Sequence, residues 1–286
     1  MKEYFKVNVD RLIVKCGLVQ SDAKINCKED NKTRAVRAFE QCAVEGCQLI
    51  CFPEAFLTSV NLPRLKEVGE SIPGPTSDFL CCMAKEKKMY VVAGIIEIKE
   101  SRVCSSAVLI NDEGKILYIY RRMHLYSLES RFLTPGTFCE VMDTPLGRLG
   151  IIIGYDINFP ETTRLLFKQK VEIIICPAQL LESFTKTVRF MTISRAAENC
   201  CYLLFCSSVG SNTLAGLTYM GNSVIVRNPI KLSPYNFGYQ NAKEIIAEAK
   251  PEETIIYGDL DLTQLRREQE ENPHYADALN LSYSRI

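Results

Sequence analysis

Short apolar runs alternate with segments of helical periodicity along almost the whole chain, and no linker or low-complexity stretch separates them. The apolar runs that predict strands are residues 11–19, 48–52, 89–97, 150–155, 171–176, 201–208, 221–227, 243–249 and 253–260. The segments that predict helices are one opening at residue 77 and residues 31–45, 160–170, 185–199 and 263–271. This alternation is typical of one layered α/β domain over residues 1–286, in which residues 262–286 form a C-terminal helix and tail and a candidate interface element.

Two pairs of apolar runs flank short turns and therefore predict β-hairpins. Residues 103–110 and 115–120 surround a turn at 111–114, and a second hairpin turns at residues 143–147. Because these hairpins are mixed with strand–helix–strand units, the pattern predicts an α/β sandwich rather than a Rossmann sheet. The sequence contains no glycine-rich nucleotide-binding motif.

The charge balance argues against several classes of protein. Of the 286 residues, 34 are basic and 34 are acidic, and a net charge of zero does not fit a nucleic-acid-binding protein, which carries a basic surface. No apolar stretch approaches the roughly 20 residues that span a bilayer, so we expect no membrane segment. Charged residues interrupt the apolar positions at the start of the chain, so we expect no signal peptide and a cytoplasmic location.

The chain has 13 cysteines but only 2 histidines. An odd number of cysteines without any C-x-x-C spacing predicts neither a disulfide framework nor a zinc site. We therefore interpret most of the cysteines as small buried apolar side chains.

Polar residues follow predicted strands at three places, and strand ends are where ligands usually bind in α/β folds. Glu54 leaves the strand at 48–52 directly after Pro53. Residues 120–125 (YRRMHL) close the first hairpin, and residues 154–161 (GYDINFPE) form an elbow between a strand and a helix, where backbone N–H groups can face an anion. From position alone, Glu54 also fits an ordinary loop carboxylate and residues 120–125 fit a solvated basic turn.

Together these segments resemble the nitrilase superfamily of carbon–nitrogen hydrolases over nearly the whole chain. Supporting matches are residues 72–75 (IPGP), 93–97 (AGIIE), 195–199 (RAAEN) and 221–223 (GNS). The resemblance implies a four-layer α-β-β-α sandwich that forms a homodimer or higher homo-oligomer. It also implies a Glu–Lys–Cys triad acting on amides, nitriles or carbamoyl amines without a metal or organic cofactor. The expected partner is then a small amide, amine or carboxylate.

The resemblance places Glu54 at the family's general base and Glu129 at its second glutamate. Arg122 stands at the lysine position, and its planar fork is not equivalent to an ammonium group. Gly154 stands at the position of the nucleophilic cysteine, and a glycine has no side chain with which to form a thioester. Three further residues are expected to border the ligand: Tyr155, Asp156 and Cys176. For Cys176 we favour a buried structural thiol over a replacement nucleophile.

Three hypotheses follow from these departures. The favoured one is an impaired or repurposed member whose pocket still binds a small molecule. The second is an enzyme that acts on a C–N bond through Glu54, Arg122 and Glu129 without a thioester, with water as the attacking group or Arg122 clamping a carboxylate. The third is an amidase inactivated at residue 154. Outside the site, residues 232–242 are expected to form a long loop, with a lid or interface loop as alternatives, and His274 a surface residue.

Overall fold

The computed structural model describes residues 11–22, 24–25, 27–212, 216–233, 236–241 and 243–281. Two six-stranded sheets dominate this part of the chain. Within it, none of the helices has the length and apolar character needed to cross a bilayer.

The first sheet contains the strands of the N-terminal half together with the last strand. In spatial order its strands are β16 (Thr254–Asp261), β1 (Ile13–Gln20), β2 (Leu49–Cys51), β3 (Tyr90–Lys99), β4 (Arg102–Ile110) and β5 (Ile116–Arg121). The strand β2 runs parallel to β1 and β3, and the other neighbours are antiparallel. The predicted hairpin across residues 111–114 is therefore confirmed as β4–β5.

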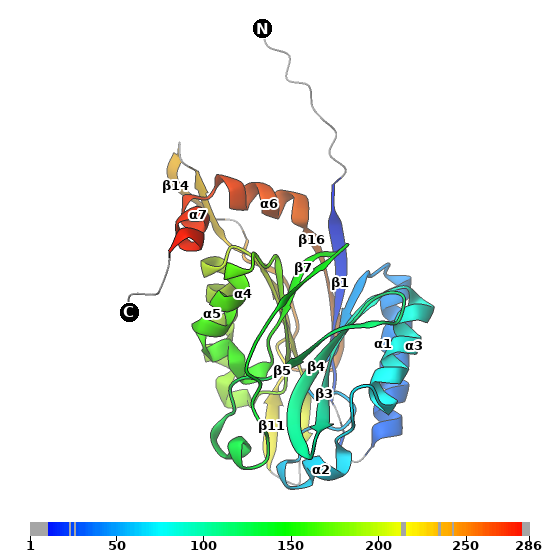
Figure 1. The fold of residues 1–286 in the computed structure, drawn as a ribbon. Helices are drawn as coiled ribbons and strands as arrows, with labels where there is room; N and C mark the ends of the chain where they lie inside the picture. Colours follow the sequence, from blue (N-terminus) through cyan, green and yellow to red (C-terminus); the bar gives the residue numbers. More distant parts are fainter. Residues whose placement is uncertain are drawn as a thin grey trace.

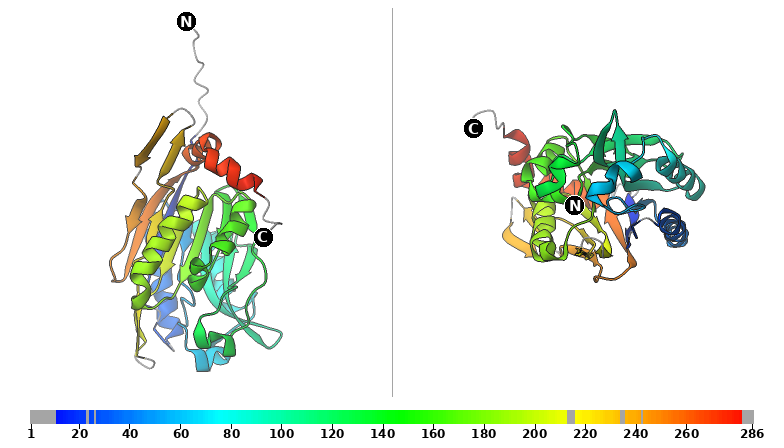
Figure 2. Two further views of the ribbon diagram at one scale, coloured as in Figure 1. Left: turned by 90° about the vertical axis from the view of Figure 1, so that its left-hand side faces the viewer. Right: turned by 90° about the horizontal axis from the view of Figure 1, so that it is seen from below.

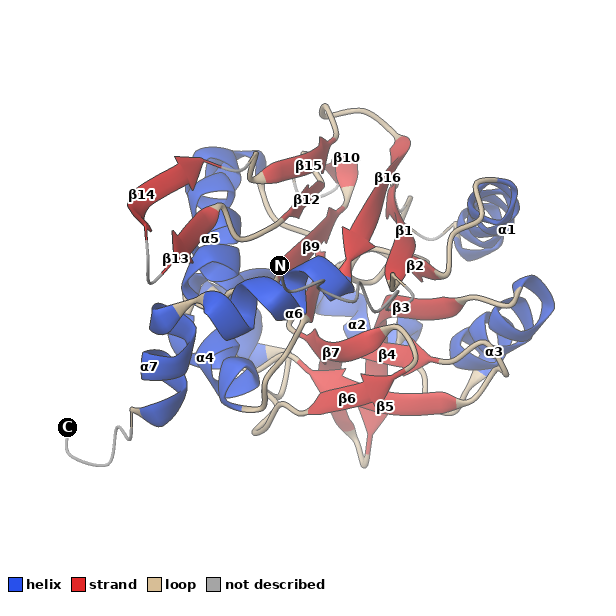
Figure 3. Cartoon of the chain, turned by 90° about the horizontal axis from the view of Figure 1, so that it is seen from above, coloured by secondary structure: helices blue, strands red, loops and turns tan. Residues whose placement is uncertain are grey.

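The second sheet repeats this plan. Its strands in spatial order are β15 (Ile245–Glu248), β12 (Val224–Val226), β9 (Tyr202–Ser207), β8 (Ile173–Ala178), β7 (Gly147–Ile151) and β6 (Val141–Thr144). The central strands β7, β8 and β9 are parallel, and β6–β7 is the second predicted hairpin. Figure 3 shows both sheets from above.

Helices cover the outer face of each sheet. The first sheet carries α1 (Lys28–Val44) and α3 (Pro75–Lys87), and the second carries α4 (Pro160–Lys168) and α5 (Thr185–Glu198), on the opposite side of the molecule (Figures 1 and 2). Successive strand residues face opposite sides of a sheet. Thus Leu49 and Cys51 join the apolar core between the sheets, whereas Ile50 joins the core under α1 and α3. The predicted four-layer α-β-β-α sandwich is confirmed.

Two helices and a hairpin lie at one end of the sandwich. The helices are α6 (Leu262–Glu271) and α7 (Pro273–Asn280), and the hairpin is β13 (Ile230–Ser233) with β14 (Asn236–Asn241) (Figure 1). Asp261 and Asn272 cap the two helices through their side chains, and Lys168 of α4 donates hydrogen bonds to backbone carbonyls at the end of α7. The C-terminal segment is therefore tied to its own sandwich.

The remaining short elements lie between the main ones. They are η1 (Leu62–Arg64), α2 (Leu65–Val68), η2 (Ser127–Arg131), η3 (Gly154–Asn158), η4 (Glu182–Phe184), β10 (Val209–Asn212) and β11 (Leu217–Met220).

Several predicted boundaries were wrong. The strand expected over residues 150–155 ends at Ile151, and η3 begins at Gly154, whose φ of +44° turns the chain. The long loop expected over residues 232–242 contains β14 instead, although residues 234, 235 and 242 lie outside the described part. The helix expected to open at residue 77 begins at Pro75. The helix α7 was missed because Asn272-Pro273 reads as a break, whereas here they are its cap and first residue.

Two predictions about side chains are confirmed. Ten of the 13 cysteines are buried, Cys27 and Cys81 are half-buried, and only Cys82 is exposed. All of them are free thiols. His274 is exposed, as expected for a surface residue.

Candidate functional site

Glu54 is a fully buried carboxylate just beyond the end of β2. Its Oε1 atom accepts hydrogen bonds from Ser105 Oγ at 2.6 Å and from Arg122 Nη1 at 2.9 Å, and its Oε2 atom accepts one from the Gln179 backbone N–H at 3.3 Å. Burial raises the pKa of Glu54 above its ordinary value. Arg122 acts in the opposite direction on this pKa without cancelling the effect, and Glu129 adds to the rise. This pKa shift suits a group that exchanges a proton.

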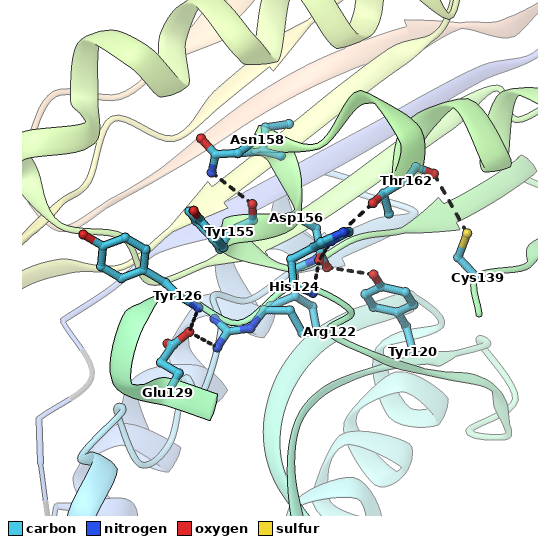
Figure 4. A network of polar contacts seen from close by, with 12 residues as sticks. Tyr120, Arg122, His124, Tyr126, Glu129, Cys139, Tyr155, Asp156, Asn158 and Thr162 are labelled. Carbon is cyan, nitrogen blue, oxygen red and sulfur yellow. Dashed lines mark hydrogen bonds and ion pairs between the residues drawn. The ribbon is translucent and has the colours of Figure 1, made fainter. Parts of the chain in front are cut away.

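Arg122 follows β5 and lies between two carboxylates. Its Nη1 atom pairs with Glu54. Its Nη2 atom lies 2.6 Å from Glu129 Oε2, and Figure 4 shows this second contact. The second contact is an ion pair that is poorly aligned for a hydrogen bond, since Nη2 and Nε have no hydrogen-bonded partner in the described part of the chain. Burial lowers the pKa of Arg122, but both glutamates outweigh it and the pKa rises, so the guanidinium stays charged. Both terminal nitrogens thus already face carboxylates of the protein.

A second set of the same residue types lies on the opposite face of the first sheet. Glu97 accepts hydrogen bonds from Ser106 at 2.6 Å and from Arg121 at 2.7 and 2.6 Å. The two sets arise from neighbouring residues of β4 and from Arg121 and Arg122 at the end of β5 and just after it, because side chains of successive extended residues alternate between faces. The Glu97 set therefore offers a control of matched chemistry for the Glu54 site.

Gly154 brings the elbow against Glu54. A Cβ atom built on Gly154 would lie 2.9 Å from Glu54 Oε2, 3.7 Å from Leu180 Cδ2 and 3.9 Å from Ala178 Cα. A side chain at this position would therefore point at the buried carboxylate. The left-handed φ of +44° also favours glycine, since other L-residues are strained there.

The side chain of Asp156 connects the elbow to the segment that carries Arg122. It is fully buried, and it accepts hydrogen bonds from the Tyr120 hydroxyl at 2.7 Å, from the His124 backbone N–H at 2.9 Å and from the Ile153 backbone N–H at 3.1 Å. His124 Nδ1 also lies 2.9 Å from Asp156 Oδ1, and its ring stacks on Phe159 at a centroid distance of 3.7 Å. Asp156 is thus saturated by its own neighbours and fixes the loop that carries Arg122 (Figure 4).

Cys176 lies in β8 beneath the elbow and is fully buried. Burial raises the pKa of this thiol well above its ordinary value of 9.0, and the backbone N–H of Gly154 offsets the rise only in part. A buried thiol of high pKa is a poor nucleophile. The geometry therefore favours the structural interpretation of Cys176.

Aromatic rings border the outer side of the site. Tyr155 packs against Tyr126 at 5.1 Å and against Phe159 at 5.3 Å, and Tyr126 packs edge-on against Phe184 at 5.5 Å. The backbone N–H of Tyr126 also donates to Glu129 at 2.6 Å. These rings join the Arg122 segment, the elbow and η4.

The structure brings the predicted site residues together but leaves their roles as predictions. Glu54, Arg122 and Glu129 are in contact, Gly154 faces Glu54, and Asp156 supports both segments. Sequence reasoning missed Ser105 and Tyr120 as polar partners in the site. A pair of serines at 105–106 in an otherwise apolar strand was an available signal, whereas a tyrosine in a strand looks like any core aromatic. Among the described residues, no group of three or more His, Cys, Asp or Glu side chains could hold a metal ion.

Comparisons with known proteins agree with this architecture. A family model described as "Carbon-nitrogen hydrolase" matches residues 15–268. The omega-amidase NIT2 of Bos taurus is 27% identical over 260 residues, covering 87% of this chain and 89% of that protein. A nitrilase of Pyrococcus abyssi is 30% identical over 262 residues, covering 90% and 93% respectively.

A solved structure extends the likeness to the fold. Saccharomyces cerevisiae Nit3, a member of branch 10 of the nitrilase superfamily, superposes with a TM-score of 0.81 at 25% identity, covering 96% of this chain and 97% of that one. The family model, the relatives and the shared sandwich lead to one conclusion: this chain belongs to the carbon–nitrogen hydrolase family of the nitrilase superfamily.

Proposed function

We propose that this chain keeps the small-molecule pocket of a carbon–nitrogen hydrolase but does not form a thioester with its substrate. In this proposal Gly154 stands at the nucleophile position and Arg122 at the lysine position. The protein then binds an amide, amine or carboxylate compound and is catalytically impaired or repurposed. The omega-amidase and nitrilase activities named for its relatives support a ligand with a C–N bond.

The observation that carries this proposal is the direction in which residue 154 faces. A Cβ atom on residue 154 would lie 2.9 Å from Glu54 Oε2, so a side chain there would meet the carboxylate that a nucleophile needs as its base. Glycine supplies no such group. Cys176, the nearby thiol, is buried and of raised pKa, which supports the view that it does not substitute.

The test is an assay of ammonia release from a panel of linear amides, nitriles and carbamoyl amines. We expect no turnover above background with the wild type, because losing the nucleophile of a comparable triad costs on the order of a million-fold. The variant carrying Gly154→Cys and Arg122→Lys should gain turnover, whereas Gly154→Cys with Arg121→Lys controls for the arginine change on the opposite face. Robust wild-type turnover that depends on Glu54 would contradict the proposal.

A second candidate function is hydrolysis of a C–N bond by direct attack of water, with Glu54 as base and Arg122 and Glu129 in support. The raised pKa of Glu54 and the position of its Oε2 atom beside residue 154 favour this candidate. It predicts slow turnover without any covalent adduct, which mass spectrometry of the reacting protein would check. Turnover that is unchanged in Glu54→Gln would remove it.

Assembly and location remain predictions. We expect a cytoplasmic homodimer or higher homo-oligomer, with residues 262–286 as an interface element. Light scattering of the full chain and of a variant lacking those residues would measure the first, and fractionation of cells would measure the second.

A further inference from the structure

We propose that a cavity on the outer face of the first sheet binds the phosphate group of a small phosphomonoester. The cavity has a volume of about 340 Å³ and lies between the turn that joins β3 to β4 and the loop of residues 134–138. Arg121, the partner of Glu97 on the face opposite Glu54, is one of its lining residues. The inference is therefore separate from the proposed function of the Glu54 site.

Three cationic side chains line this cavity, namely Lys99 at the end of β3, Arg102 at the start of β4 and Arg121 at the end of β5. Lys99 and Arg102 are direct partners in the register of β3 with β4, and Glu97 and Cys104 are the next pair on the same face. Cys104 is buried and also lines the cavity. Burial is the main cause that raises the pKa of this thiol, and Glu97 adds to the rise, whereas all three cations oppose it. The three charges therefore gather around one part of the cavity.

Each of these cations retains capacity to bind an anion. Arg121 uses its Nε and Nη2 atoms on Glu97, and its Nη1 atom has no partner in the described part of the chain. Lys99 forms no ion pair with any described residue. Arg102 pairs with Glu100 at 3.2 Å, but these side chains are 63% and 69% exposed, so the pair is weak and a ligand can replace it. The cavity thus carries an excess of positive charge.

The number and the placement of the donors favour a phosphate over a carboxylate. A phosphate monoester carries a charge of about −1.5 to −2 at neutral pH and presents three strong acceptor oxygens. A carboxylate carries a single negative charge on two oxygens. Donors from three different strands can each meet a different phosphate oxygen. Thr134 and Thr137 also line the cavity, and a threonine hydroxyl can donate a further hydrogen bond.

The loop of residues 134–138 gives the cavity a fixed wall. It donates two backbone hydrogen bonds, at 2.7 and 2.8 Å, to β4 and to the residue after β5. A Cβ atom on Gly136 would collide with the carbonyl oxygen of Arg121, so glycine lets this loop pack closely on the strand. Phe138 also lines the cavity and is 53% exposed, so its ring can receive an aromatic group of the ligand.

Isothermal titration of the full chain with phenyl phosphate, inorganic phosphate and benzoate tests this inference. We expect phenyl phosphate to bind about fivefold more tightly than inorganic phosphate, because its ring packs on Phe138. It should bind at least about tenfold more tightly than benzoate, which has less charge and fewer oxygens. Phe138→Ala should bring phenyl phosphate down to the affinity of inorganic phosphate.

Two charge variants at exposed positions test the cavity without disturbing the core. Lys99→Gln and Arg102→Gln should each weaken phenyl phosphate binding by about three- to tenfold. The matched control is Lys115→Gln, which removes the same charge at the other end of the β4–β5 hairpin and should leave binding unchanged.

Four results would each overturn the inference. They are no phenyl phosphate binding by folded wild-type protein, benzoate binding as tight as phenyl phosphate binding, an equal loss in Lys115→Gln, and undiminished binding in both charge variants. Inorganic phosphate that binds as tightly as phenyl phosphate would overturn the assignment to an ester.

Discussion

Replacing Arg122 with methionine should destabilise the fold by about 3–5 kcal/mol at neutral pH, the usual cost of leaving buried carboxylates without their counter-charge. The side chain of Arg122 is 3% exposed and that of Glu54 is 2% exposed, so water cannot take over the role of the guanidinium. Methionine has a similar length and fills most of the space. The loss therefore measures charge rather than volume.

The pH dependence of this loss has a definite sign. Burial already raises the pKa of Glu54, and Arg122 is the main group that opposes the rise. Without Arg122 the pKa of Glu54 in the folded state rises further. Its carboxyl group therefore stays protonated and neutral up to a higher pH than in the wild type. A carboxyl group whose folded pKa lies above its unfolded pKa lowers stability as pH rises through that interval. The variant should therefore lose most stability at neutral pH and less at about pH 5.

Urea unfolding at both pH values, on four proteins, measures the effect. The set is the wild type, Arg122→Met, Glu54→Gln and the double variant, and the double variant should recover part of the loss because it leaves one charge fewer unpaired. The control Arg121→Met should cost less, since the side chain of Arg121 is 20% exposed and water can enter the space that it leaves, although Glu97 itself is 3% exposed. A loss below about 1 kcal/mol for Arg122→Met, or strictly additive losses in the double variant, would refute the reasoning.

Three other predictions follow from contacts described above. Brief treatment of the native protein with iodoacetamide should label Cys82, which is exposed, and leave Cys176 unlabelled until the protein unfolds; early labelling of Cys176, seen by peptide mass spectrometry, would contradict its burial. Tyr120→Phe should cost about 1–3 kcal/mol in urea unfolding, because Asp156 loses a buried 2.7 Å hydrogen bond, and an unchanged midpoint would contradict this. Lys168→Met should speed amide exchange in α7 but not in α1, because its ammonium group no longer holds the final carbonyls of α7; equal exchange in both proteins would count against that role.

The order of strands and helices was predictable because most elements have a clear apolar period bounded by turn residues. The period reports burial, however, and not the direction of the backbone. Ile152 and Ile153 are fully buried, so the apolar run continued past the true end of β7 at Ile151. The left-handed backbone at Gly154 marks the place where the chain turns, and the apolar pattern of the sequence does not predict the positive φ angle of that residue.

The site was predictable in outline because polar residues at strand ends converge. Glu54 and the elbow follow strands of different sheets, and the sandwich brings these ends together. The partners of Glu54 were harder to foresee, because the contact of Ser105 with Glu54 depends on how β2, β3 and β4 pair across the sheet. Pairing over such sequence distances is set by the whole sheet rather than by local spacing.

The adjacent serines of β4, and the adjacent arginines at the end of β5 and just after it, also bear on how this sheet assembles. If β5 slipped by one residue along β4, one of the two buried glutamates would still meet an arginine, since Arg121 would replace Arg122 or the reverse. A hairpin misaligned by one residue would therefore lose only one of the two ion pairs between glutamate and arginine. Tyr120 distinguishes the correct register from a slipped one more strongly, because it is fully buried between the sheets and a slip by one residue would turn it to the opposite face.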